Sequence, residues 1–507
     1  MFVVDILHTM GELVRLLFMT VLLAGFLLTP GTHANPVYDF NDNCRNAYNA
    51  VMQLRVQEAS RLLAIEKHSN PSNLVPVMLE NYIDFFELFF NEDPAAYRRY
   101  QGNYQRRLEL LSSGPENSPY YLHAKSVVHL QWAFIQVKFG KHWDGGWSFR
   151  RSFLQSRENN RKFPGFTPSL LYVGAMETAA GTIPDGYKWL SGLLGIKGSI
   201  DAGIKKLETF INDKEPLSEL YRDEAIFYYL YLRNYVLNDR KGVFQYLQDH
   251  SFDLVNNHLF AYMAANLSIN NQRSAKARSI ISAINRSAEY LQTPVWDLEM
   301  GYAKLYMLDK SAGAHFERFI RDFRGRYYVK DALQKLSWYY YLQGNRQQAQ
   351  RYRDMILEKG TLDTEADKQA NKEAQTKQWP NPLLLRARLL NDGGNNREAL
   401  ALLHGKTIDD FERREDKLEF AYRAGRLFDD LDNEEQAIRF YKLALSLGEK
   451  RPEYFAARAA LQIGYIFEKK QLCDEAGIWF RKCLEMKDHD YKNSLDQKAK
   501  AGIMRCR

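Results

Sequence analysis

Cysteine is scarce in this chain, with four residues among 507: Cys44, Cys473, Cys483 and Cys506. No two of them form a C-x-x-C pair, which argues against a zinc ribbon or a redox motif. In an oxidising compartment, Cys483 on a predicted repeat helix and Cys506 on the final helix are the best candidates for a disulfide. The alternative is that both are small core residues.

Long apolar runs and proline are also rare. After the first 34 residues, no apolar run reaches the length of about eighteen that a membrane-spanning helix needs. Fifteen prolines in the whole chain suit long helices with short connections. The net charge of +7 is modest, and Lys and Arg are interspersed with Asp and Glu. This pattern is typical of solvated helix faces, so no nucleic-acid partner is expected.

Sequence motifs of catalysis are absent too. The chain contains no H-E-x-x-H and no G-x-S-x-G. His142-Trp143-Asp144 is a local His/Asp cluster, and the Gly145-Gly146 that follows makes a turn its ordinary interpretation. An enzyme built on the His142 region would need a nucleophile and an orienting group from elsewhere. We therefore predict that the protein is not an enzyme and has no catalytic residues, no metal site and no cofactor.

Residues 1–34 have the composition of a secretory signal peptide. Leu16–Leu28 is an apolar run of thirteen residues, preceded by Arg15 and ended by Pro30. It leads to Thr32–Ala34, a small-x-small cleavage site. Cleavage after about Ala34 would give an exported, soluble protein of the periplasm or cell envelope.

The sequence of residues 35–214 predicts a first helical region, in which repeats are faint, with a glycine-rich insert at 163–210. Seven glycines fall between Gly174 and Gly203, which implies tight turns or close approach of backbones. One interpretation is an apolar element, exposing Trp189 and Leu193, that docks on a protein partner or a membrane surface. The other is a compact helical insert buried against its neighbours.

The clearest pattern is a small-residue register in the second half of the chain. Pairs of small residues stand twelve positions apart, and large residues follow them: Ala387 with Ala399, Gly425 with Ala437, and Gly464 with Ala476. Two antiparallel helices cross closely where both side chains are small, and large side chains fill the groove beside the crossing. Residues 215–507 therefore predict a series of helical hairpins that ends in a polar capping helix. The fold class expected is all-α, a right-handed α-solenoid after an irregular helical N-terminal region.

At these residues the chain resembles the tetratricopeptide repeat (TPR) superfamily, most specifically over Leu418–Asp488 and well over Asn381–Lys406. The whole chain looks like exported bacterial TPR proteins with no assigned activity. A local stretch, Ile183–Leu207, is similar to the tetratricopeptide repeat protein 39 family, which is associated with inclusion-body clearance and lipid.

The TPR resemblance implies a concave surface that binds protein or peptide partners. The residues of this chain at the family's binding positions are Trp338, Tyr341, Arg388, Tyr422, Arg426 and Tyr465. The alternative for the aromatic residues among them is packing against the neighbouring repeat. We expect a non-enzymatic scaffold or adaptor. The alternatives are an envelope protein that contacts lipid or a membrane protein through residues 163–210, and, more remotely, an enzyme with a site near His142.

Overall fold

The computed structural model describes residues 35–182, 195–376 and 378–506. Within these ranges the regular structure is helical, apart from one bridge between Val37 and Asn73. The all-α prediction is confirmed. The predicted signal peptide, Trp189 and Leu193 lie outside the described residues.

The first part of the chain forms a helical body in which proline and polar caps mark several helix starts. Pro94, Pro119 and Pro168 each open a helix, where the missing N–H costs nothing. The helices of this N-terminal body are α2 (Asp42–Met52), α3 (Val56–Ser69), α4 (Val75–Asn91), α5 (Pro94–Ser112), α6 (Pro119–Lys138), α7 (His142–Lys162), α8 (Pro168–Gly181), α10 (Ile200–Asn212), α11 (Pro216–Leu220), α12 (Arg222–Tyr235) and α13 (Arg240–Asp249).

Helical hairpins follow, in which helices pack on the next one along the chain, except at the step from α20 to α21, and in most hairpins also on the next but one. This is the contact pattern of an α-solenoid. Their helices are α14 (His258–Asn270), α15 (Ser274–Ala283), α16 (Val295–Leu305), α17 (Ala312–Asp322), α18 (Val329–Leu342), α19 (Arg346–Glu358), α20 (Glu365–Gln375), α21 (Pro382–Asp392), α22 (Asn396–Leu403), α23 (Arg414–Asp430), α24 (Glu434–Gly448), α25 (Phe455–Lys469), α26 (Cys473–Glu485) and α27 (Lys492–Arg505), with a short 3-10 turn, η2 (Ile408–Asp410).

The six hairpin turns share one backbone conformation. A residue in the left-handed region ends the first helix, and the next residue donates its N–H to the carbonyl five positions back, as Asn433 does to Phe428. This is the Schellman motif, which satisfies the free carbonyls of a helix end. The left-handed positions are Gln272, Leu308, Gly344, Gly394, Asp432 and Gln471.

Small residues lie where the paired helices approach each other. A Cβ atom added to Gly425 would lie 2.7 Å from the ring of Tyr441, and one added to Gly464 would lie 2.5 Å from Phe480. Ala387, Ala399, Ala437 and Ala476 are fully buried. Replacing any of these residues by a larger one would push the two helices apart.

The glycine-rich insert is, in its described part, a close helix crossing. A Cβ on Gly203 of α10 would lie 2.2 Å from the Thr178 hydroxyl of α8. Tyr172 of α8 and Leu207 of α10 are buried in the main N-terminal core. These contacts support the interpretation as a buried helical insert.

The region around His142 was wrongly predicted as a turn, because α7 begins at His142 and continues through both glycines. Gly145 allows α7 to lie close to α6: a Cβ there would be 2.8 Å from Val137. Gly145 thus serves helix packing rather than a change of direction.

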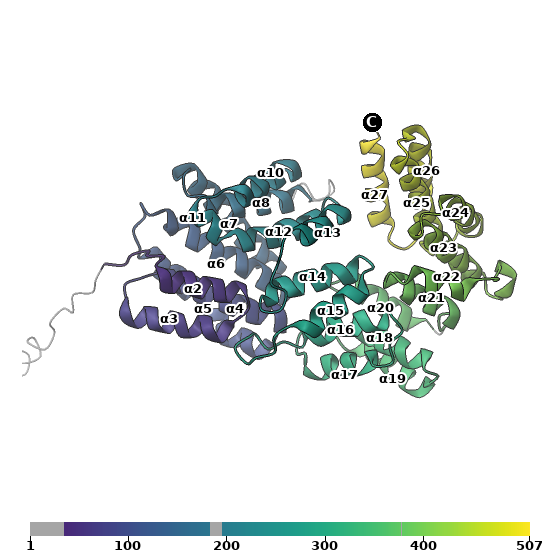
Figure 1. Cartoon of the computed structure of the whole chain (residues 1–507), viewed down its shortest axis with the longest axis horizontal. Helices are drawn as coiled ribbons and strands as arrows, with labels where there is room; N and C mark the ends of the chain where they lie inside the picture. Colours follow the sequence, from purple (N-terminus) through teal and green to yellow (C-terminus); the bar gives the residue numbers. More distant parts are fainter. Residues whose placement is uncertain (1–34, 183–194, 377, 507) are drawn as a thin grey trace, which may run out of the picture.

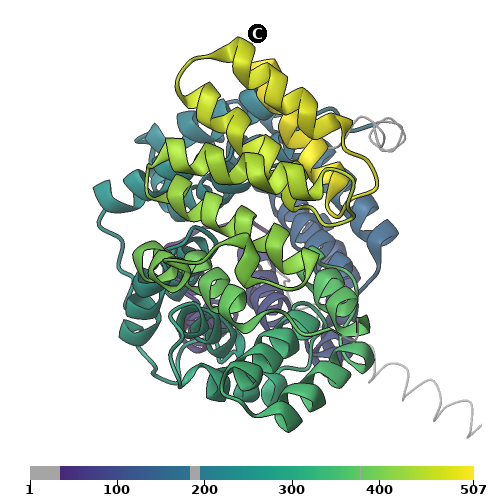
Figure 2. The same cartoon turned by 90° about the vertical axis from the view of Figure 1, so that its right-hand side faces the viewer.

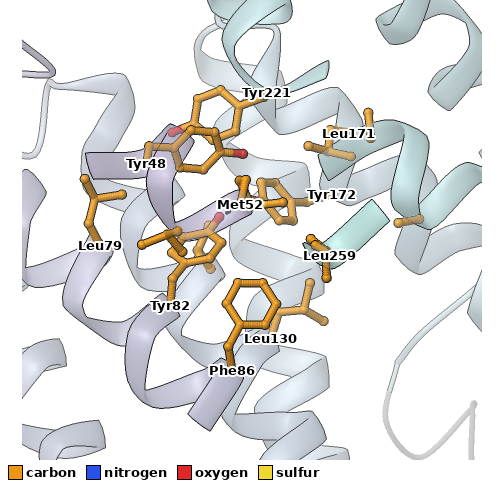
Figure 3. Packing of buried hydrophobic residues seen from close by; sticks show 14 of the residues in the cluster. Tyr48, Met52, Leu79, Tyr82, Phe86, Leu130, Leu171, Tyr172, Tyr221 and Leu259 are labelled. Atoms are coloured by element: carbon orange, nitrogen blue, oxygen red, sulfur yellow. Dashed lines mark hydrogen bonds between the residues drawn. The ribbon is translucent and has the colours of Figure 1, made fainter. Parts of the chain in front are cut away.

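One hydrophobic core runs from Phe40 to Leu291 and crosses the predicted domain boundary at residue 214 without a break. Figure 3 shows its centre, where Tyr48, Tyr82 and Tyr172 come together from α2, α4 and α8, and Leu259 of α14 joins them. Further cores lie within the hairpins.

In Figure 1 the N-terminal body lies on the left, α14–α20 lie low in the centre, and α21–α27 rise on the right until α27 comes to face α13. Figure 2 shows α21–α27 stacked above α14–α20. We call α21–α27 the C-terminal arm.

Candidate functional site

The candidate site is the side of the C-terminal arm that faces α13, called here the inner face. It contains the half-buried residues of the predicted concave surface, together with cations that the sequence did not single out. Its geometry follows from the hairpin stack, since the first helix of each hairpin (α21, α23, α25) and then α27 lie in succession along it.

Trp338 and Tyr341 of α18 lie in packing contacts. Trp338 is 1% exposed, donates its indole N–H to Glu373 at 2.6 Å, and carries the guanidinium of Arg388 4.8 Å from its ring centre. Tyr341 stacks on Trp379 at 4.6 Å between ring centroids. Both rings face neighbouring elements rather than solvent.

Tyr422 of α23 is also buried by the following hairpin. It is 2% exposed, and its ring lies 6.0 Å from that of Tyr454 and 5.2 Å from that of Phe455. For these three aromatic residues the structure shows the packing alternative, and a role in binding a partner stays a prediction.

Arg388, Arg426 and Tyr465 are half-buried and line the inner face. Asp392 joins the two arginines, with Oδ2 3.6 Å from Nε of Arg388 and Oδ1 3.5 Å from Nη1 of Arg426. Arg426 lies 3.7 Å from Asp430 as well. These ion pairs fix the arginines between α21 and α23 and leave them partly open to solvent.

Arg240, Arg458 and Lys498 form a cation cluster without an ion pair in the described part of the chain, although the carboxylate of Asp430 is close enough to favour the charged form of Arg240. They come from α13, α25 and α27, and within the described residues none of their side chains makes a hydrogen bond or ion pair. The Nε atom of Arg458 is buried without a partner. Burial, followed by the charges of Arg458 and Arg240, lowers the pKa of Lys498 to about 8. Burial, followed by Arg458 and Arg426, lowers the pKa of Arg240 too.

Sequence reasoning missed this cluster because no local pattern contains it. Arg240 lies more than two hundred residues before Arg458 and Lys498 in the chain, and only the curvature of the solenoid brings α13 to the arm (Figure 1). Single cations on helices otherwise look like ordinary solvated residues.

The positions of the cysteines do not match the predicted disulfide between Cys483 and Cys506. Cys483 is fully buried in the core of the arm. Cys506 instead lies beside Cys473, and burial, then a hydrogen bond with Cys473, raises its pKa to about 11. The reason is the packing of α26 on α27, which places the start of one helix next to the end of the other.

No cluster of three or more His, Cys, Asp or Glu side chains suited to a metal ion occurs in the described ranges. In the same ranges, none of the helices combines the length and the apolar character needed to cross a bilayer. His142 is exposed in the first turn of α7.

No family model matches the chain, and no curated protein matches it. Among solved structures, it is similar to the crystal structure of the APC/C hetero-tetramer Cut9-Hcn1, with 13% sequence identity over 91% of this chain and 95% of that chain. The TM-score of that superposition is 0.25.

Proposed function

We propose that the protein is a non-enzymatic, TPR-like scaffold that binds an acidic segment of a protein partner along the inner face of its C-terminal arm. The observation that carries this proposal is the cation cluster of Arg240, Arg458 and Lys498. Arg458 is half-buried, whereas Arg240 and Lys498 are exposed. Other buried or half-buried arginines of the arm have carboxylate partners, as Arg426 with Asp392 and Arg423 with Glu419 show.

Cations left together without a carboxylate raise the free energy of the folded protein, and an anionic ligand would lower it. An extended acidic peptide suits a groove lined by successive parallel helices, because its carboxylates can meet cations from several of them. We further propose that the protein works outside the cytoplasm, on the evidence of the signal-peptide composition of residues 1–34.

The test is fluorescence polarisation with a labelled glutamate-rich peptide and its glutamine-rich counterpart. We expect the acidic peptide to bind and its affinity to fall with added salt. Arg458→Gln and Lys498→Gln should each weaken binding about tenfold, the loss of one charge-assisted hydrogen bond.

Lys500→Gln is the matched control. Lys500 lies on the same helix, two residues from Lys498 and therefore on a different face, and it is exposed. Equal binding of both peptides, or an equal loss in the Lys498 and Lys500 variants, would refute the proposal.

A further inference from the structure

A cavity of about 700 Å³ lies where the N-terminal body meets the first hairpins of the solenoid. Its walls come from α4, α6 and α12 on one side and from α14, α16 and the start of α18 on the other (Figure 1). This volume is typical of small-molecule sites, and junctions between structural units are common places for them. We call it the aromatic cavity.

The lining is dominated by aromatic rings of two kinds. Phenylalanines from α4 and α12 form an apolar wall, represented by Phe86, Phe89 and Phe227. Tyrosines from α12, α14 and α16 line the cavity as well, and Tyr262 meets Phe90 edge to face at 5.0 Å between centroids. Tyr235 is 57% exposed and Tyr328 is 45% exposed, so the cavity reaches the surface beside these two residues.

Most charged groups in the lining are already paired. Lys138 bonds to Glu92 at 2.5 Å, and Lys335 bonds to Asp331 at 2.6 Å. Glu224, although buried, accepts hydrogen bonds from the hydroxyls of Tyr48, Tyr82 and Tyr172 at 2.7, 2.9 and 2.9 Å. These groups are satisfied without a ligand.

Glu299 of α16 differs from them. It is 4% exposed and lines the cavity, and among the described residues its carboxylate accepts one hydrogen bond, from Asn266 at 2.9 Å. No lysine or arginine of the described chain forms an ion pair with it. Burial raises its pKa to about 7. After burial, the negative charge of Glu299 is the next cause that raises the pKa of Tyr262 and of Tyr328, so the carboxyl lies close to the tyrosine wall.

We propose that the aromatic cavity binds an amphipathic organic cation, with a substituted ammonium group beside Glu299 and the tyrosine faces and an apolar body against the phenylalanines. Three alternatives fit less well. An anion would face an unpaired carboxylate, a neutral apolar molecule would leave that carboxylate uncompensated, and a metal ion would lack ligands. A substituted ammonium gains both the ion pair and the electrostatic attraction of aromatic faces.

The experiment is isothermal titration calorimetry of the full chain at pH 8, where Glu299 is charged. Decyltrimethylammonium is the probe, used below its micelle concentration, and decyl sulfate and decanol are comparison ligands of the same chain length. We expect saturable binding of one decyltrimethylammonium per chain and much weaker binding of the other two. Glu299→Gln should reduce the affinity about tenfold, because it removes the charge and keeps the shape.

Glu485→Gln, an exposed carboxylate of the C-terminal arm, is the control and should leave the affinity unchanged. Tyr262→Leu is a second variant that keeps an apolar side chain and removes a ring, and it should weaken binding severalfold. Circular dichroism would verify the fold of each variant. Indistinguishable binding of the three ligands, or an unchanged affinity in both Glu299→Gln and Tyr262→Leu, would overturn the proposal. The peptide assay on the arm is independent of this outcome.

Discussion

The aromatic cavity and the inner face of the C-terminal arm carry opposite charge imbalances. Among the described residues, the buried carboxylate of Glu299 in the cavity forms no ion pair with a cation, whereas Arg458 and Lys498 of the arm and Arg240 of α13 form no ion pair with a carboxylate. The surroundings differ as well: aromatic rings enclose Glu299, and solvent reaches the arm. The comparison teaches that one helical architecture can offer an enclosed site for a small cation and an open site for an extended anion.

The two regions also differ in how their folding is organised. The N-terminal body shares one core from Phe40 to Leu291, whereas helices of the arm pack on their neighbours in sequence. Structures of the second kind can unfold in part.

The largest expected effect distinguishes unfolding of the N-terminal body from partial unfolding of the arm. Gly203→Val should destabilise the N-terminal body by about 3 kcal/mol or more, because a side chain there meets Thr178 and backbone atoms of α8. Gly464→Val should instead unfold the arm and leave α2–α12 protected. Hydrogen exchange followed by mass spectrometry measures both. Loss of protection throughout the chain in the Gly464 variant would contradict the distinction.

Glu299 should make the free energy of unfolding depend on pH. Since its folded pKa is raised from 4.5 to about 7, the folded state holds the proton more tightly than the unfolded chain. The resulting stability is fully present below about pH 4.5 and is lost as the pH rises to about 7. Compared with Glu299→Gln, the wild type should lose about 2 to 3 kcal/mol over this window. Urea unfolding at a series of pH values tests it, and parallel curves for the two proteins would rule it out.

A disulfide would change the arm by a smaller amount. With oxidised glutathione, Cys473 and Cys506 should pair, because Cys506 lies beside Cys473 and Cys483 is buried elsewhere. The bond would stabilise the arm by about 2 kcal/mol. Peptide mapping identifies the pair, and Cys473→Ser should abolish the gain. A Cys483–Cys506 bond would show that the arrangement of α26 and α27 is different in solution.

The smallest expected effect concerns the pH dependence of the cation cluster. Since the pKa of Lys498 is about 8, this lysine loses its positive charge as the pH rises from 7 to 9, and the affinity of the protein for an acidic peptide should fall severalfold. Lys498→Arg should bind equally well at both pH values, because arginine keeps its charge. The polarisation assay measures both proteins. If the two lost affinity alike, another group would be responsible for the pH dependence.

The sequence predicted the hairpins because their determinants are local. A small residue at Gly425 and another at Ala437 mark a helix crossing wherever the two helices lie in the chain. The glycines at 145 and 146 were misread for the opposite reason: whether they turn the chain or allow close packing depends on α6, a separate helix.

The sequence named Arg388, Arg426 and Tyr465 of the inner face, but neither the cation cluster nor the aromatic cavity could be predicted from it. Glu299 stands in an ordinary helical pattern, and nothing in its neighbours along the chain shows that tyrosines from α12 and α14 will surround it. Glu373 likewise stands in the charged helix α20, yet it accepts a hydrogen bond from the buried Trp338. Such pairings depend on tertiary contacts between distant segments.

The residue at the left-handed position of each hairpin turn affects the rigidity of the arm, and it can be replaced without changing the residues of the cation cluster. Two of its left-handed positions are glycine, but Asp432 and Gln471 pay a conformational penalty that glycine would not. Exchanging either residue for glycine should raise the unfolding midpoint of its own hairpin by the equivalent of about 1 kcal/mol. The choice of this one turn residue therefore affects the stability of its own hairpin, and the stiffness of the scaffold can be varied without replacing Arg458 or Lys498.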